Sequence, residues 1–256
     1  MKRVLLLGGL DPSGGAGITV DATVAALHDV APLPIALTTT VQGLRGFVSA
    51  APVSARVWRR QIEEALHDGP VAAVKVGYVG DAAVIAEVAD ALGSLVSAVP
   101  LIVDPVMSAT AGGMGSGQSV VAAYRDALIP LATLVTPNSP ELAQLGDGDP
   151  SVLLRAGAGA VLHKGGHSVG QDVVDELWAG GPPSRFVRPR LRCGLVRGTG
   201  CALACAIAAR LALGSALSAA CEGAGDWLAS LLGAVQPRPD GLPQSLPLSR
   251  GGTTRG

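Results

Sequence analysis

A Gly-Thr-Gly-Cys run at residues 198–201 combines residue types that can hold a phosphate group and move a proton. The run opens an alanine-rich segment with a helical pattern, and the first N–H groups of a helix have no partner inside it. Three such groups, backed by the helix dipole, can form an anion hole for phosphoryl charge. The same field would lower the pKa of the Cys201 thiol, and a thiolate there could accept a substrate hydroxyl proton during phosphoryl transfer. We therefore interpret this run as a catalytic phosphate cradle made of Gly198, Thr199, Gly200 and Cys201.

A glycine-rich run at residues 8–17 directly follows the first predicted strand and leads into a helix. Glycines let a backbone approach a ligand closely, and the helix start offers free N–H groups. The spacing is neither a Rossmann fingerprint nor a Walker loop, so a purely structural turn is an equal alternative. Asp21 follows on a helix face that otherwise looks inward, where a carboxylate needs a partner such as a ligand hydroxyl or amine. The alternative is a surface aspartate on a helix of different phase.

Gln42 stands at the end of the second predicted strand. A glutamine amide offers an acceptor and a donor side by side, which would match the edge of an aminopyrimidine. A solvated glutamine in a turn is the alternative.

Polar residues also follow three later predicted strands. Asp104 follows one of them, Asn138 and Glu141 follow the next, and Lys164 follows the third. Ligands of open α/β sheets gather at the carboxyl ends of strands, so these side chains are expected to face one crevice. Asn138 and Glu141 could orient phosphates or a water on Mg²⁺, although a helix cap by Asn138 fits their spacing equally well. Lys164 can reach triphosphate oxygens as a point charge.

Short apolar runs alternate with longer helical patterns, which is typical of a parallel sheet covered by helices. Several predicted strands are apolar on successive residues, as in strands buried on both faces. They cover residues 4–7, 35–39, 71–76, 101–103, 133–135 and 160–163. A β-hairpin over 173–178 and 185–188 and two helices over 200–213 and 215–235 should follow. We expect one domain over residues 1–235 and a loosely ordered Pro/Gly-rich tail over residues 236–256.

Composition excludes several classes of protein. The 256 residues suit a single α/β domain. A net charge of −1, no basic run and 3% aromatic residues argue against a nucleic-acid binder. No apolar stretch is long enough to span a bilayer, and residues 4–7 are too short for a signal-peptide core, so no membrane contact and a cytoplasmic location are expected. Four cysteines without a CxxC pair or a nearby histidine cluster predict no zinc site.

The order of these motifs resembles that of the hydroxymethylpyrimidine/phosphomethylpyrimidine kinases of thiamine biosynthesis, within the ribokinase-like superfamily. The resemblance runs from residue 5 to about residue 213, and its strongest pieces lie at residues 11–18, 104–107, 136–138, 164–167 and 198–201. It implies a doubly wound, mostly parallel sheet flanked by helices on both faces. It also implies ATP, Mg²⁺, a homodimer, and phosphorylation of a hydroxymethyl group and then of the resulting monophosphate.

The resemblance further implies a role for each candidate residue. A cysteine in place of the aspartate of related sugar kinases favours the pyrimidine or pyridoxal branch, with Cys201 as the base and residues 198–200 as the anion hole. By the same resemblance, the pyrimidine would be bound by Gly9, Asp21 and Gln42. ATP would be bound by Asn138, Glu141 and Lys164. Mg²⁺ would be held, directly or through water, by Asp104 and Glu141.

Some positions depart from the family pattern. Arg197 stands where a histidine is usual, and would either grip the substrate's phosphate or take over the packing of that histidine. Tyr78 stands where a methionine is common near the substrate. The loop at residues 111–117 lacks the usual Ser-Gly-Asp element, and the segment between Glu141 and Lys164 is shorter than typical. These departures leave open whether one or both phosphorylation steps occur.

Two alternatives to a pyrimidine kinase remain. The first is a pyridoxal kinase, since pyridoxal also carries a hydroxymethyl group on an aromatic nitrogen ring. Gln42 discriminates against it, because pyridoxal has no exocyclic amine. The second is a non-catalytic binding or regulatory protein of the same fold, which would have no need of Lys164, Glu141 and Cys201.

Overall fold

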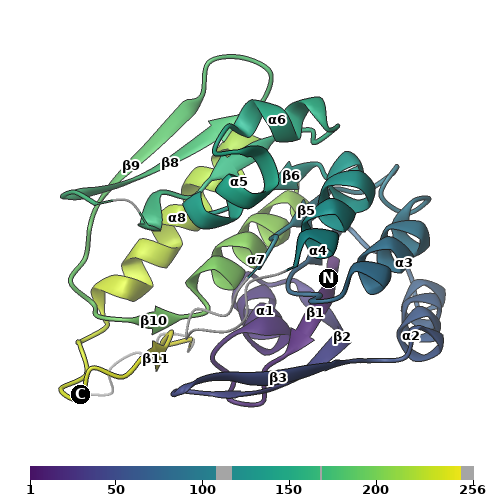
Figure 1. Cartoon of the computed structure of the whole chain (residues 1–256), viewed down its shortest axis with the longest axis horizontal. Helices are drawn as coiled ribbons and strands as arrows, with labels where there is room; N and C mark the ends of the chain where they lie inside the picture. The colour runs from purple at the N-terminus through teal and green to yellow at the C-terminus, as the bar shows by residue number, and fades with distance from the viewer. Residues whose placement is uncertain (108–116, 168, 249–256) are drawn as a thin grey trace.

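One sheet runs through the molecule and carries helices on both faces (Figure 1). The computed structural model describes residues 1–107, 117–167 and 169–248. Within these residues the sheet has nine strands in the order β3-β2-β1-β4-β5-β6-β7-β8-β9. Their bounds are β1 Arg3–Leu10, β2 Ala31–Gly43, β3 Gly46–Pro52, β4 Ala73–Val76, β5 Leu101–Val103, β6 Leu134–Val135, β7 Val161–His163, β8 Asp172–Trp178 and β9 Ser184–Pro189.

Strand direction follows the predicted pattern. β1, β2 and β4 to β7 run parallel, whereas β3, β8 and β9 pair antiparallel with their neighbours. All six strands expected in the parallel part and the expected hairpin are present, so the prediction of a doubly wound, mostly parallel α/β fold is confirmed. β3 was not predicted, because most of its residues are exposed and it therefore has no apolar periodicity.

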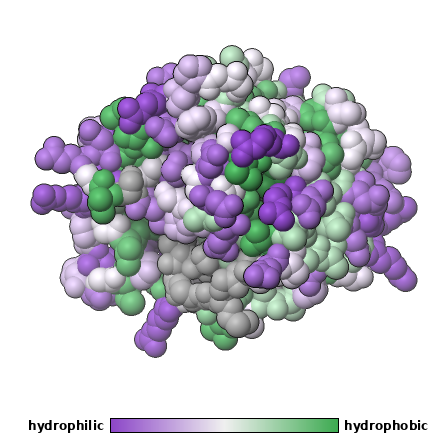
Figure 2. All heavy atoms as spheres, turned by 45° about the horizontal axis from the view of Figure 1, so that its top comes forward, coloured by the Kyte–Doolittle hydropathy of each residue, from purple (hydrophilic) through white to green (hydrophobic). Residues whose placement is uncertain are grey.

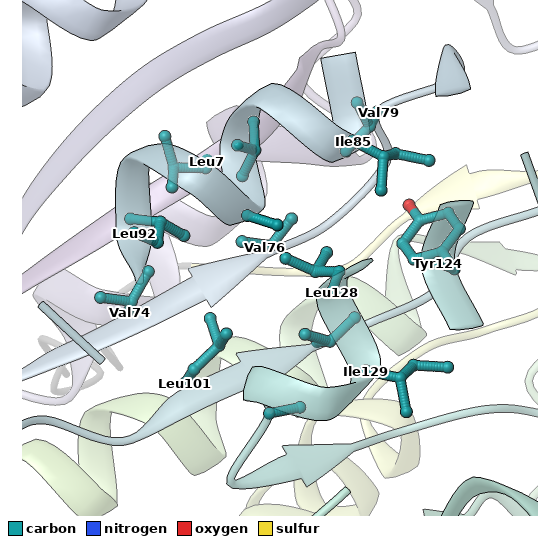
Figure 3. Packing of buried hydrophobic residues seen from close by; sticks show 14 of the residues in the cluster. Leu7, Val74, Val76, Val79, Ile85, Leu92, Leu101, Tyr124, Leu128 and Ile129 are labelled. Carbon is teal, nitrogen blue, oxygen red and sulfur yellow. The ribbon is translucent and has the colours of Figure 1, made fainter. Parts of the chain in front are cut away.

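Two separate apolar cores lie on the two faces of the sheet. Alternate residues of a strand point to opposite faces, so Leu5 and Leu7 of β1 enter one core while Val4 and Leu6 enter the other. The first core, part of which Figure 3 shows around Leu7, packs against helices α2 to α6. The second packs against α1, α7 and α8. The helices are α1 Gly17–Leu27, α2 Ala55–His67, α3 Ala82–Leu92, α4 Gln118–Ala123, α5 Ser139–Gly146, α6 Pro150–Arg155, α7 Thr199–Ala212 and α8 Leu217–Gly233, with short turns η1 Tyr124–Leu128, η2 Ile129–Leu131 and η3 Gly165–His167.

The surface mixes polar and apolar residues. On the face shown in Figure 2, hydrophobic residues occur in small patches between hydrophilic ones. Within the described part of the chain, none of the helices combines the length and the apolar character needed to cross a membrane.

The described part of the C-terminal tail contacts the domain. Strand β11 Gln244–Ser245 pairs in parallel with β10 Val196–Arg197, and Leu246 is buried in the second core. The last eight residues, 249–256, lie outside the described residues, as do residues 111–116 of the loop after Met107. The division into a domain over residues 1–235 and a loosely ordered tail stays a prediction.

The glycine-rich turn after β1 brings the start of α1 against the end of the strand. Leu10 and Gly17 form an isolated bridge, and Gly17 has a φ of 63°. A Cβ at residue 17 would collide with the carbonyl oxygen of Gly9. Glycine is therefore required at this position both by conformation and by space.

Alanine substitutions can separate these two requirements. Gly14 has a φ of 70° and a Cβ there would meet nothing within 4 Å, so Gly14→Ala carries only the conformational cost. We expect Gly14→Ala to lower the free energy of unfolding by about 1–2 kcal/mol. Gly17→Ala should lower it by about 2–5 kcal/mol, since the backbone must also move to relieve the collision. Urea unfolding of both variants measures the difference, and equal losses would show that the contact with Gly9 imposes no constraint.

Candidate active site

A cleft of about 690 Å³ opens at the carboxyl ends of the parallel strands. Ten of the eleven residues predicted for the site line it: Gly9, Gln42, Asp104, Asn138, Glu141, Lys164, Gly198, Thr199, Gly200 and Cys201. The prediction that the strand-end residues face one crevice is confirmed. Asp21 is not among the lining residues, and its surroundings are described below.

The start of α7 lies against the glycine-rich turn. Gly198 precedes the helix with a φ of 74°, and a Cβ on it would collide with the carbonyl oxygen of Gly15. A Cβ on Gly200 would lie 3.3 Å from Lys164 Nζ and 3.9 Å from Asp104 Oδ2. The two glycines thus allow the helix start to approach both the turn and the charged side chains. The free N–H groups of the first helical turn therefore lie beside a lysine, as an anion hole requires.

A buried cluster of opposite charges lies beside the helix start. Lys164 Nζ is 2.8 Å from Asp104 Oδ1 and 3.8 Å from Glu141 Oε2, and the hydroxyl of Thr136 donates to Asp104 Oδ1 over 3.2 Å. Burial alone would lower the pKa of Lys164, but the two carboxylates outweigh it and raise this pKa. Burial likewise opposes ionisation of Asp104, yet Lys164 and Lys75 hold the pKa of Asp104 below its usual value. Lysine and aspartate are therefore both charged at neutral pH.

Asn138 and Glu141 form a helix capping box at the start of α5. The Glu141 N–H donates to Asn138 Oδ1 over 2.9 Å, and the Asn138 N–H donates to Glu141 Oε2 over 2.8 Å. The capping interpretation of Asn138 is thus confirmed, and its side-chain oxygen is occupied by its own helix. Burial raises the pKa of Glu141.

The carboxylates of the cleft are suited to a Mg²⁺ ion whose other ligands are phosphate oxygens. Asp104 Oδ2 is buried and has no hydrogen-bond partner among the described residues. Mg²⁺ is commonly held by one or two carboxylates together with substrate phosphates and water. In the described ranges, no three His, Cys, Asp or Glu side chains come close enough to hold a metal by themselves. A magnesium ion here would therefore depend on the phosphates it neutralises.

Cys201 lines the cleft, but its thiol is not activated in the way the sequence predicted. Its pKa is raised to about 12, mainly by burial; Lys75 opposes this rise, and the carboxylates of Asp104 and Asp21 add to it. The prediction of a lowered pKa is wrong, because the loss of solvation outweighs the field of the helix start. Cys205 and Cys221 are buried in the second core.

Asp21 lies on the inward face of α1 and is completely buried. Its Oδ2 is 2.7 Å from Nζ of Lys75, a buried lysine of β4. Burial raises the pKa of Asp21 to about 6, against the influence of Lys75. Burial alone would lower the pKa of Lys75, but the carboxylate of Asp21 outweighs it and raises this pKa. The partner of Asp21 is therefore a protein lysine, which corrects both the expected ligand contact and the surface alternative.

Two residues were not predicted from the sequence: Lys75, which pairs with Asp21, and Phe47, which lines the cleft. Lys75 had a signal, because a lysine inside an otherwise apolar strand must find a partner. Phe47 had none, since it belongs to the unpredicted strand β3. Its ring packs edge-on against Tyr78 with centroids 6.2 Å apart, and a Cβ on Gly9 would lie 3.0 Å from the Tyr78 ring. Both rings line the cleft.

Arg197 is buried, and its guanidinium points to the glycine-rich turn and the end of β2. It forms an ion pair with Asp11 and donates to the oxygen of the Gln42 amide. Arg197 was expected either to grip the substrate's phosphate or to take over the packing of the usual histidine. The second expectation describes the arrangement, because Asp11 already pairs with the charge of Arg197. Apolar side chains of the segment before Arg197 and of helices α7 and α8 also line the cleft: Leu195, Leu203, Leu228 and Leu232.

Comparison with known proteins agrees with this geometry. The sequence pattern of the family described as phosphomethylpyrimidine kinase matches residues 11–239. A hydroxymethylpyrimidine/phosphomethylpyrimidine kinase of Rhizobium meliloti is 36% identical over 78% of this chain and 79% of its own length. The enzyme of that name from Escherichia coli is 31% identical over 91% of this chain and 92% of its own. The pyridoxal kinase from Staphylococcus aureus in complex with AMP-PCP superposes with a TM-score of 0.85, at 25% identity, over 96% of this chain and 93% of its own.

The buried pair of Asp21 and Lys75 can be tested by a double-mutant cycle. Asp21→Asn and Lys75→Met each leave one buried charge without its partner and should each lower the free energy of unfolding by about 3–5 kcal/mol. The double variant should lose less than the sum, because neither member of the pair then leaves the other as an unpartnered buried charge. Urea unfolding of the four proteins measures this coupling.

The exposed pair of Arg60 and Glu64 on α2, whose side chains lie 2.7 Å apart and are 68% and 57% exposed, is the matched control. Its coupling should not exceed about 0.5 kcal/mol. Additive losses at Asp21 and Lys75 would contradict the assignment of these two residues as mutual partners.

Proposed function

The chain belongs to the phosphomethylpyrimidine kinase family, and on that premise we propose that it phosphorylates 4-amino-5-hydroxymethyl-2-methylpyrimidine and then its monophosphate, with ATP, in thiamine biosynthesis. The observation that carries the proposal is the juxtaposition of a free helix start with a buried lysine and an unpartnered carboxylate oxygen in one cleft. A protein that only binds a small ring has no need of such a site. Phosphoryl transfer needs all three, because charge accumulates on the transferred group.

ATP would lie with its base toward the leucine-lined part of the cleft and its phosphates toward the start of α7. The N–H groups of residues 199–201 and the ammonium of Lys164 would bind the phosphate oxygens. Asp104 and Glu141 would hold Mg²⁺, directly or through water, and the ion would neutralise charge on the phosphates. Asn138 would contribute indirectly, by fixing the orientation of Glu141 through the capping box.

The pyrimidine would occupy the end of the cleft formed by Gly9, Gln42, Tyr78 and Phe47. The two aromatic rings offer an apolar surface for the heterocycle, and the Gln42 amide offers polar contacts to its edge. Asp21 would not contact the pyrimidine. It would hold the Lys75 ammonium in a position where the ammonium stabilises negative charge on Cys201.

Cys201 would accept the proton of the substrate hydroxyl. Its thiol carries its proton at neutral pH, so the thiolate is a minor species but a strong base when it forms. A loose transition state for phosphoryl transfer demands little help from a base until late in the reaction. Most of the rate acceleration would therefore come from the anion hole, Lys164 and Mg²⁺.

Pyridoxal is the alternative substrate, favoured by the likeness to the pyridoxal kinase of Staphylococcus aureus. The aromatic end of the cleft would accept either ring. The contacts of the Gln42 amide favour the aminopyrimidine, because pyridoxal offers no exocyclic amine. The homodimer and the cytoplasmic location that the resemblance and the sequence suggested stay predictions.

An assay that couples ADP release to an absorbance change distinguishes a pyrimidine kinase, a pyridoxal kinase and a non-catalytic binding protein. We expect turnover with the pyrimidine alcohol and with its monophosphate, and a value of kcat/KM for pyridoxal that is lower by roughly ten- to hundredfold, the effect of one unpaired buried polar group. Turnover of the alcohol alone would restrict the enzyme to the first step. Preference for pyridoxal would replace the proposed substrate, and binding without ADP release would make the protein a non-catalytic member of the family.

The base role of Cys201 predicts a pH dependence. Because the thiol has a pKa of about 12, the thiolate fraction rises about tenfold for each pH unit across the neutral and mildly alkaline range, and kcat should rise with it by a smaller factor, since the loose transition state depends only partly on the base. Cys201→Ala should lose turnover and this slope while it still binds ATP in calorimetry. Cys201→Ser, which keeps the size of the side chain, is the control for packing. Near-normal turnover in Cys201→Ala would end the assignment.

A further inference from the structure

The guanidinium of Arg197 joins separate segments of the cleft wall at the substrate end. The residue is 3% exposed and belongs to β10, directly before the phosphate cradle. Its Nη1 and Nη2 donate to four oxygens on the turn after β1 and at the end of β2. They are Asp11 Oδ2 at 3.1 Å, Ser13 Oγ at 3.1 Å, Gln42 Oε1 at 2.9 Å and Gly43 O at 3.0 Å. A single side chain therefore fixes the relative positions of these segments.

These contacts determine which end of the Gln42 amide is the oxygen. Arginine has only donors, so the amide atom that faces Arg197 must be an acceptor. At the other end, the hydroxyl of Thr40 donates its proton to the carbonyl oxygen of Leu10 over 2.8 Å, so it can only accept from Gln42 Nε2, at 2.9 Å. Hydrogen bonds thus run in one direction from Arg197 through Gln42 and Thr40 to Leu10. The amide cannot turn over without breaking bonds at both ends.

We propose that Arg197 is a positioning residue that sets the substrate specificity of the cleft by fixing the polarity of the Gln42 amide. This inference rests on the proposed function. One N–H of Gln42 and one lone pair of its oxygen remain for a ligand, in a fixed order along the cleft wall. A ring that carries an acceptor nitrogen next to an exocyclic amine matches this order, whereas a ring without the amine leaves the oxygen lone pair unmatched.

The backbone around Arg197 is built to hold the side chain in place. Arg197 pairs with Ser245 of β11, which places the C-terminal strand behind it. On the other side, a Cβ at Gly15 would lie 3.3 Å from Arg197 Nη1 and 3.1 Å from Ser245 Oγ, so the glycine leaves room for both. The arginine is thus oriented before any ligand binds, and specificity that relies on it needs no rearrangement.

Two substitutions and their combination test the proposal. Arg197→Lys keeps a positive charge beside Asp11, but a single ammonium cannot reproduce the planar fork that reaches four oxygens. Gln42→Met removes the amide while keeping the size of the side chain. Calorimetry with the pyrimidine alcohol and with pyridoxal gives the ratio of their dissociation constants, and ADP release gives kcat and KM for each compound.

We expect Arg197→Lys to weaken the preference for the pyrimidine alcohol by roughly tenfold or more, mainly through its dissociation constant and KM, with a smaller change in kcat. Gln42→Met should weaken the preference to a similar degree. In the Gln42→Met background, Arg197→Lys should have no further effect on the ratio, because Arg197 acts through the amide. Arg3→Met removes an arginine that donates to Gly69 O over 2.7 Å and to Ala65 O over 2.9 Å, at the other end of β1. It should lower stability and leave the ratio unchanged.

The outcomes distinguish this proposal from the proposed function. If wild-type protein prefers the pyrimidine and Arg197→Lys lowers only the melting temperature, Arg197 is structural and the inference is overturned. Equal effects of Arg197→Lys in the wild-type and Gln42→Met backgrounds also overturn it, because the arginine then acts by another route. A wild-type protein that shows no preference between the two compounds contradicts the proposed substrate and the inference together.

Discussion

The close approach of α7 to the turn after β1 is the constraint on which the site depends. A Cβ on Gly198 would collide with Gly15, just as one on Gly17 would collide with Gly9, so only glycines allow the backbones to meet. The approach brings the N–H groups of α7 to the carboxyl edge of the sheet, beside Lys164 and Asp104. The phosphate cradle is therefore a product of two glycine-rich segments, and neither segment would form it alone.

Enclosing this cradle requires charge to be buried, and buried charge must be paired. Lys75 with Asp21 and Lys164 with Asp104 meet this demand at 2.7 and 2.8 Å. The same loss of solvation raises the pKa of Cys201, although the thiol lies at a helix start. Burial of these groups would thus strengthen their electrostatic contacts to a bound phosphate and oppose the ionisation of Cys201, the proposed base. In such a cleft the fixed donors would contribute more to the proposed phosphoryl transfer than the proton acceptor would.

Many parts of the site were predictable because each carries a local pattern. Gly9 lies at the end of an apolar strand, Asp104 and Lys164 directly follow two others, and strands of a parallel sheet end at one edge, so their convergence followed from the predicted fold. The capping box of Asn138 and Glu141 was visible in their spacing. Phe47 was not predictable, because β3 is largely exposed and shows no periodicity. Asp21 was placed on the correct face of its helix, but its partner could not be named, since Lys75 is 54 residues away.

By itself, the sequence determined the alternation of parallel strands with helices, the glycine positions at the cradle and the residues that end the parallel strands. All of these depend on residue type and short-range spacing. Only the tertiary structure decided that Asp21 pairs with Lys75, that burial raises the pKa of Cys201, and that Arg197 orients Gln42. Arg197 and Asp11 are 186 residues apart, and their ion pair forms only when α7 meets the first turn. Hydrogen bonding and desolvation depend on distances between such remote groups, which no local pattern encodes.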